Sequence, residues 1–170
     1  MYAFWIRSIV GNLRNAYSAE WKRRGKGRVA TWIAAPCALL VVTYAAYGLL
    51  GAAVLLGQAL VSVLMLETVN YIEHYGLVRE NKGAVLPRHS WNSSTSFGNA
   101  VMFNLQRHSD HHASSGKPYF LLESIDDAPQ LPAGYPAMML LALLPGAWKA
   151  VMDGRIGATT GEDLTKQKGE

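Results

Sequence analysis

The chain has 170 residues, half of them apolar, and a formal net charge of +4 at pH 7, so it is about the size of one domain. Its basic residues gather just before a long apolar segment, a placement that fits a membrane flank and argues against nucleic acid as a partner. A single cysteine, Cys37, excludes an intramolecular disulfide.

The first predicted element is an apolar run over residues 29–66, which contains no Asp, Glu, Lys or Arg. One membrane-spanning helix needs roughly 20 apolar residues, so the run is about twice as long as one crossing requires. We therefore predict two transmembrane helices with a tight turn near residues 48–51. A single steeply tilted helix and a re-entrant pair are the alternatives. Because basic flanks stay in the cytoplasm, the segments on both sides of the run should face that compartment.

The inner end of the second predicted span carries ionisable side chains. Residues 70–77 read Asn-Tyr-Ile-Glu-His-Tyr-Gly-Leu, and Glu67 lies just before them. An ionisable residue at the end of an apolar helix is costly unless it has a partner, so Glu67, Glu73 and His74 are candidate functional residues. Glu67 and His74 are two helical turns apart and share nearly one face. The alternative is that these side chains simply lie among the lipid headgroups.

A polar loop is predicted after Arg79, and residues 97–112 then favour a helix with Ser96 as its N-cap. On this helix His108, His111 and His112 occupy positions i, i+3 and i+4, which project from one face with Cβ atoms about 5–6 Å apart. Three imidazoles can therefore converge. Neutral imidazole suits iron, zinc, copper or nickel, so the spacing alone leaves the metal open. A hydrated surface cluster of histidines is the alternative.

Residues 117–136 are predicted as a loop, and residues 135–152 as a helix interrupted at Pro145-Gly146. The predicted fold class is thus an all-α integral membrane protein with two transmembrane helices, a cytoplasmic histidine-bearing helix and a C-terminal surface helix. We expect residues 1–152 to form one membrane domain and residues 153–170 a polar, disordered tail.

Two segments carry a resemblance to a known family. Residues 105–113, Leu-Gln-Arg-His-Ser-Asp-His-His-Ala, and residues 70–77 resemble the third histidine box and the intervening histidine motif of bacterial membrane alkane hydroxylases, the rubredoxin-dependent alkane 1-monooxygenases. The order and spacing also match, as do residues 88–92 between the motifs and residues 127–132 after them. The resemblance covers about residues 6–152.

The resemblance implies two non-haem iron ions held by histidines at the cytoplasmic ends of membrane helices. It implies terminal hydroxylation of medium-chain alkanes to 1-alkanols, with dioxygen as oxidant and rubredoxin as electron donor, in the lipid of the bacterial inner membrane. The matching iron ligands are His74, His108, His111 and His112.

Supporting residues are implied as well. Glu73 and Asp110 flank ligands and would orient imidazoles by accepting their second N–H group, as metal-bound histidines usually require. Glu67 is a further candidate for this role. His89 also matches a family position, and its neighbours suggest a loop that is ordered against the site. We do not expect His89 to be a ligand.

The chain also departs from the family. The first two histidine boxes, H-E-x-x-H and E-H-x-x-x-H-H, are absent, and the chain has only five histidines, which do not fill two iron coordination spheres. We therefore interpret it as the C-terminal part of a hydroxylase, inactive alone. The alternatives are a related diiron oxygenase or desaturase that acts on xylene or fatty acyl chains, and a catalytically dead membrane fragment whose histidines bind zinc or nothing.

Overall fold

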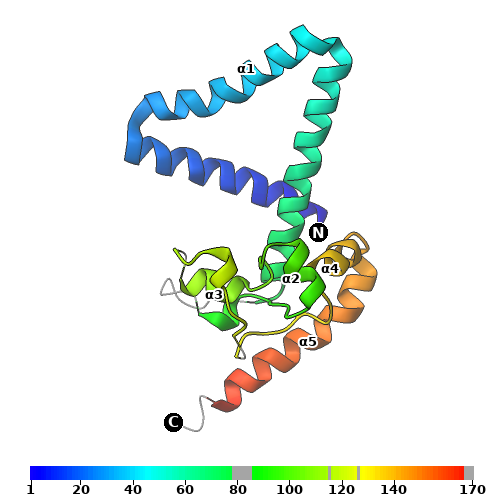
Figure 1. Cartoon of the computed structure of the whole chain (residues 1–170). Coiled ribbons are helices and arrows are strands. Elements are labelled where there is room, and N and C mark those ends of the chain that lie inside the picture. Colours follow the sequence, from blue (N-terminus) through cyan, green and yellow to red (C-terminus); the bar gives the residue numbers. More distant parts are fainter. Residues whose placement is uncertain (78–85, 115, 126, 167–170) are drawn as a thin grey trace. The chain divides into compact units, whose positions relative to one another are not determined.

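The computed structural model describes residues 1–77, 86–114, 116–125 and 127–166, without the side chains of residues 24–28 and 157–166. Within these ranges the regular structure is helical, and the one extended pairing is an isolated parallel bridge between Asn92 and Gln130 (Figure 1). The predicted all-helical class is therefore confirmed. The chain divides into two compact units, residues 2–67 and residues 68–170, the second together with Met1.

The unit of residues 2–67 is formed by helix α1, which runs over Tyr2–His74 and also enters the other unit. Among the described residues, the stretch Val29–His74 is the one helical segment that is long and apolar enough to cross a membrane. Its large apolar side chains are widely exposed, and Leu49 and Leu50 each expose 76% of their surface. An apolar surface of this extent is not stable in water, so it indicates contact with lipid or protein.

Glycine breaks helix α1 where the sequence predicts a turn. Gly48 has a φ of +65° inside the helix, a conformation that L side chains rarely adopt. A Cβ atom at Gly51 would lie 2.4 Å from the Cβ atom of Tyr47, so a larger residue does not fit there either. Figure 1 shows α1 changing direction sharply in its cyan part, which includes these residues. The turn is thus a distortion within one helix, without a separate loop.

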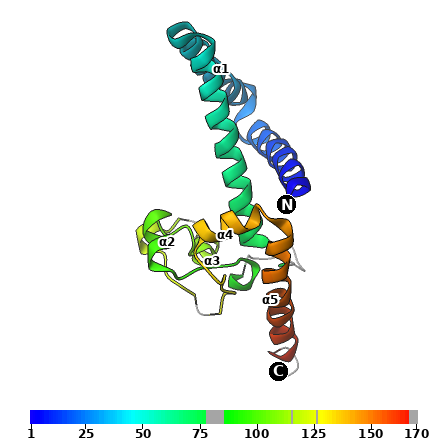
Figure 2. The same cartoon turned by 90° about the vertical axis from the view of Figure 1, so that its right-hand side faces the viewer.

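In its described residues, the unit of residues 68–170 contains the end of α1 and six further elements. These are η1 (Pro87–His89), α2 (Ser96–Val101), α3 (His108–Ala113), η2 (Tyr119–Leu121), α4 (Tyr135–Ala142) and α5 (Pro145–Lys166). Its core is made of large side chains that expose at most 1% of their surface, namely Ile72, Trp91, Tyr135, Met138, Trp148 and Met152. Figure 2 shows α4 and the start of α5 next to the end of α1, where Trp148 packs 5.4 Å from the Tyr71 ring.

The predicted single helix over residues 97–112 is wrong. The structure has two helices, α2 and α3, separated by a turn in which Phe103 and Asn104 have φ values of 51° and 59°. Helix α2 also begins after Thr95, without a side-chain cap from Ser96. The turn is held by Asn104, whose Nδ2 donates to the carbonyl oxygen of Tyr119 at 3.0 Å. Such a contact, 15 residues away in sequence, cannot be seen in a local helical pattern.

The predicted interruption near Pro145 is confirmed, because α4 ends at Ala142 and α5 begins at Pro145. Proline is well tolerated at the first position of a helix, where no intrahelical donor is needed. Residues 153–170 are predicted as a polar, disordered tail, but the structure differs: helix α5 continues through residues 153–166 and ends at Lys166. Residues 80–85 of the predicted polar loop lie outside the described residues.

Candidate metal centre

Three histidines from two helices meet in the unit of residues 68–170. His74 is the last residue of α1, and His108 and His112 lie one turn apart on α3. Each ring offers one nitrogen atom as a ligand, and these three nitrogen atoms all lie within 4.8 Å of one another. The rings of His108 and His112 have centroids 4.2 Å apart, and His74 lies 5.4 Å from His108. This cluster has the size of a first coordination shell around one metal ion.

His108 is the most buried of the three, with 9% of its surface exposed. Within the described part of the chain, neither of its ring nitrogens has a hydrogen-bond partner. Burial, with the neighbouring His112, His74 and His111, lowers the pKa of His108 to about 3. The ring is therefore neutral at physiological pH and keeps a lone pair for a metal. A buried ring nitrogen without a hydrogen-bond partner is costly in a folded protein. Nδ1 of His108 faces Glu73, and a metal ion bound at Nε2 would remove the cost there.

A backbone contact determines which ring nitrogen of His74 keeps its lone pair. Its Nδ1 lies 3.3 Å from the carbonyl oxygen of His89, and because a carbonyl only accepts, Nδ1 must carry the proton. The lone pair then lies on Nε2. A metal-bound histidine commonly makes this type of bond with its second nitrogen, which fixes the orientation of the ring.

The ring of His89 accepts a hydrogen bond from the backbone of Leu86. The backbone N–H of Leu86, the residue before the short helix η1, donates to Nδ1 of His89 at 3.0 Å and so caps the start of this helix. The contact with His74 that the structure shows is made by the backbone carbonyl group of His89. Sequence patterns carry no signal for such a contact, because any residue at position 89 has a carbonyl group.

The other predicted site residues lie at different distances from the cluster. His111 is exposed, and its ring lies 6.0 Å from those of His108 and His112, outside the group of three. Glu73 is 1% exposed, and its Oε1 lies 3.3 Å from Nδ1 of His108. Glu73 therefore contacts one of the clustered imidazoles.

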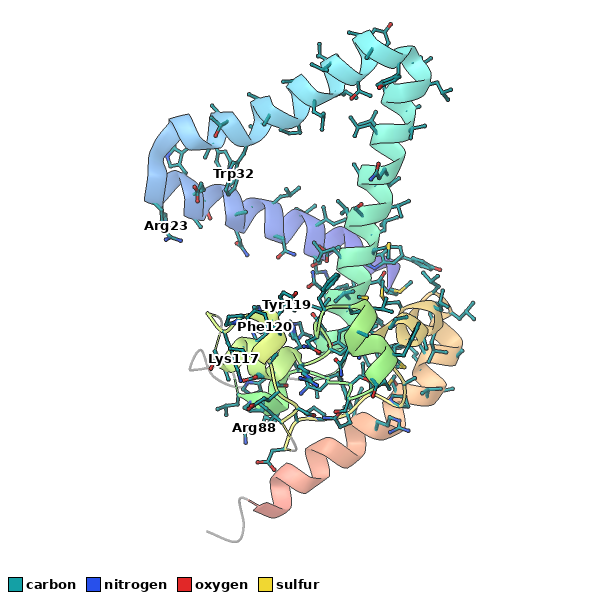
Figure 3. All side chains as sticks on the ribbon, viewed as in Figure 1. Arg23, Trp32, Arg88, Lys117, Tyr119 and Phe120 are labelled. Atoms are coloured by element: carbon teal, nitrogen blue, oxygen red, sulfur yellow. The ribbon has the colours of Figure 1, made fainter. Side chains whose placement is uncertain are left out.

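Asp110 and Glu67 make other contacts. Oδ2 of Asp110 accepts from Nζ of Lys117 at 2.8 Å and from the backbone N–H of Glu123 at 2.7 Å. Burial tends to raise the pKa of Asp110, but these hydrogen bonds outweigh it and the pKa is lowered. Lys117 is labelled in Figure 3, with Tyr119 and Phe120 of the following helix η2. Glu67 belongs to the unit of residues 2–67, where Asn12 donates to it at 3.4 Å.

The predicted site loop lies between the two histidine-bearing helices. Trp91 donates from its backbone N–H to the carbonyl oxygen of Glu73, and Oδ1 of Asn92 accepts from the backbone N–H of Ser109. Ser109 also donates from its hydroxyl to the carbonyl oxygen of Pro87 at 2.8 Å. These bonds explain why histidines 34 positions apart in sequence meet: the same loop binds the end of α1 and the start of α3.

Gln106 is a structural residue that no sequence pattern indicates. It is fully buried, its Oε1 accepts from the backbone N–H of Tyr135, and its Nε2 donates to Asn99 Oδ1 and the carbonyl oxygen of Thr95, both at 3.3 Å. A Cβ atom at Gly98 would lie 2.3 Å from Oε1 of Gln106. The amide thus joins the segment before α3 to α2 and α4. The sequence feature that could have identified Gln106 as a residue near the site is its position two residues before His108.

Comparison with known proteins adds to this geometry. The family model described as fatty acid desaturase matches residues 2–142. Alkane 1-monooxygenase 1 of Pseudomonas aeruginosa is 43% identical over 188 aligned residues, which cover 100% of this chain and 49% of that protein. Alkane 1-monooxygenase 2 of Alcanivorax borkumensis is 42% identical over 172 residues, 93% of this chain and 45% of that protein.

A more distant similarity is to the xylene/toluene monooxygenase hydroxylase component of Pseudomonas putida, at 27% identity over 165 residues, 89% of this chain and 43% of that protein. The chain thus spans about half the length of the curated relatives it matches. The histidine cluster lies within the matched residues.

Proposed function

Because the chain belongs to the fatty acid desaturase family, we propose that it supplies one part of the iron site of a membrane alkane 1-monooxygenase. The observation that carries this proposal is the convergence of His74, His108 and His112 in a chain 36–43% identical to several alkane 1-monooxygenases. The proposed reaction inserts one oxygen atom of dioxygen into a terminal methyl group of a medium-chain alkane and yields a 1-alkanol. Rubredoxin is the proposed electron donor.

We propose that His74, His108 and His112 hold one of two non-haem iron ions, and that His111 contributes to the second. Bound iron would supply the activation of dioxygen. The protein's own residues keep His108 neutral by burial, orient His74 through the carbonyl oxygen of His89, and hold the carboxyl group of Glu73 beside His108. The four histidines do not complete two coordination spheres, so the proposed activity belongs to a longer protein.

The proposed location is the bacterial inner membrane, with the histidine cluster on the cytoplasmic side. The stretch Val29–His74 has 46 residues, or about 69 Å of helix at 1.5 Å per residue. This is more than twice the roughly 30 Å thickness of the hydrocarbon core. The positive φ of Gly48 divides the stretch into two parts of suitable length, which supports two crossings.

Xylene is the alternative substrate, since one relative is named as a xylene/toluene monooxygenase component. Its identity to this chain, 27%, is lower than the 36–43% of the alkane 1-monooxygenases. This difference favours an unbranched alkane over an aromatic methyl group.

A chimera tests the proposed function. The matching half of the Pseudomonas aeruginosa relative would be replaced by this chain, and cells would receive octane and ¹⁸O-labelled dioxygen. We expect ¹⁸O-labelled 1-octanol, measured by mass spectrometry. The same chimera with His112→Ala should give none, because one ligand of the cluster is lost.

Two outcomes would count against the proposal. One is a chimera that is present in the membrane and loaded with iron but forms no 1-octanol. The other is preferential oxidation of the methyl groups of xylene when both substrates are supplied, which would favour the alternative.

A further inference from the structure

We propose that residues 89–92, here called the strap, position the metal-binding histidines by capping the two helices that carry them, with Trp91 and Asn92 as the positioning residues. This inference rests on the proposed metal site and extends it to side chains that bind no metal. The strap lies between α1 and α3 in space, and three kinds of contact connect it to them.

The first contact fixes the end of α1. The last carbonyl groups of an α-helix lack partners within the helix, and here Trp91 supplies two donors. Its backbone N–H donates to the carbonyl oxygen of Glu73 and its Nε1 to that of Tyr75, each at 2.8 Å. Trp91 is 1% exposed, so its indole ring has little freedom to move. The carbonyl groups on both sides of His74 are therefore held by one residue.

The second contact sets the protonation pattern of His74. With the end of α1 fixed by Trp91, the carbonyl oxygen of His89 lies 3.3 Å from Nδ1 of His74. That oxygen keeps the proton on Nδ1 and the lone pair on Nε2. If Trp91 released the helix end, this backbone contact would be lost and either ring nitrogen would carry the proton.

The third contact fixes the start of α3. The residue before this helix, Arg107, makes no side-chain cap, and Oδ1 of Asn92 takes its place by accepting from the backbone N–H of Ser109 at 3.0 Å. Asn92 is itself held on both sides, because its N–H donates to Pro129 and its carbonyl oxygen accepts from Leu131, each at 2.8 Å. The orientation of α3, and with it that of His108 and His112, thus depends on a side chain outside the helix.

The strap therefore connects the C-terminal end of α1 to the N-terminal end of α3. The end of α1 presents carbonyl groups, to which Trp91 of the strap donates. The start of α3 presents N–H groups, from one of which Asn92 of the strap accepts. A shift of the strap would displace His74 relative to the histidines of α3. Supporting residues of this kind typically change metal affinity by about 10–100-fold when they are replaced.

Nitrogen-15 NMR of the metal-free full chain in detergent tests the effect on His74 without any metal. We expect the Nδ1–H form of His74 in the native chain and a mixture of the two forms in Trp91→Phe, which keeps the aromatic ring but removes the indole donor. Trp148→Phe is the matched control. Trp148 is fully buried and its Nε1 has no hydrogen-bond partner among the described residues, so this variant should keep the Nδ1–H form.

Cobalt(II) titration of the same chain tests the effect on the cluster. Asn92→Leu should weaken Co²⁺ binding by about 10–100-fold, and Asn92→Asp should restore most of the affinity because its carboxylate can still accept from Ser109. Equal Co²⁺ affinities for the two Asn92 variants, or an unchanged form of His74 in Trp91→Phe, would overturn the proposal. If Asn92→Leu does not fold, the NMR comparison decides.

The two experiments distinguish a wrong proposal about the strap from a wrong proposal about the metal site. Suppose that the native chain shows the Nδ1–H form of His74, that Trp91→Phe loses this form, and that the native chain binds no Co²⁺. The proposal about the strap is then supported and the proposed metal site is refuted. If the native chain binds Co²⁺ and none of the three strap variants changes this binding or the His74 ring, the metal site holds and the strap is refuted.

Discussion

Replacing His108 with alanine is expected to weaken binding of a divalent metal by the full chain at least about 100-fold, beyond the roughly 10–100-fold range of supporting residues. His108 lies closest to the other clustered rings, 4.2 Å from His112 and 5.4 Å from His74. Burial keeps its ring neutral, with a pKa of about 3. Its loss removes a ligand and leaves the remaining two histidines without a buried centre. The affinity is measured by Co²⁺ titration in detergent.

His89→Asn is the matched control, because it also removes a histidine from the same unit. The His89 ring accepts from Leu86, a role that the amide oxygen of asparagine can take over, and its backbone carbonyl is unchanged. We expect Co²⁺ affinity to fall by less than about tenfold, the lower limit for a supporting residue. Equal losses in His108→Ala and His89→Asn would mean that metal binding does not depend on the cluster.

The second large effect is expected at Gln106. Its Nε2 donates to oxygens of Asn99 and Thr95, and its Oε1 accepts from the backbone N–H of Tyr135. Gln106→Glu keeps the acceptor, but its ionised form places a second oxygen, which cannot donate, against the oxygens of Asn99 and Thr95. Since Gln106 is fully buried, we expect a loss of unfolding free energy on the order of 3–5 kcal/mol.

The matched control for this substitution is Gln130→Glu. Gln130 is exposed, so the added charge remains in contact with solvent and should change the unfolding free energy by less than about 0.5 kcal/mol. Denaturant unfolding followed by tryptophan fluorescence compares the two variants with the native chain. If Gln106→Glu were as stable as Gln130→Glu, the amide would not be the link between α2, α3 and α4 that the structure indicates.

Sequence patterns predicted those features that depend on near neighbours in the chain. The helical spacing that places His108 and His112 on one face holds within α3. The interruption at Pro145 and the break at Gly48 follow from the backbone preferences of proline and glycine. The apolar composition before Glu67 predicted two membrane-crossing helices; among the described residues the structure has one continuous helical stretch, Val29–His74, that is long and apolar enough to cross, so the number of spans stays a prediction.

Features that depend on distant contacts could not be predicted in this way. The division between α2 and α3 depends on Asn104 reaching the backbone of Tyr119, and the orientation of His74 depends on the backbone of His89. Asp110 directly precedes His111 in the sequence, but its carboxylate accepts hydrogen bonds from Lys117 and from the backbone of Glu123. Spacing along the chain identifies the residues of a motif and says little about which partner each one contacts.

X-ray absorption spectroscopy of the iron-loaded full chain tests the central claim, that His74, His108 and His112 bind the same metal ion. We predict an imidazole scattering signal from three rings, reduced by about one ring in His74→Ala, which removes the only clustered histidine outside α3. An unchanged signal in that variant, or iron bound by oxygen ligands alone, would contradict the account.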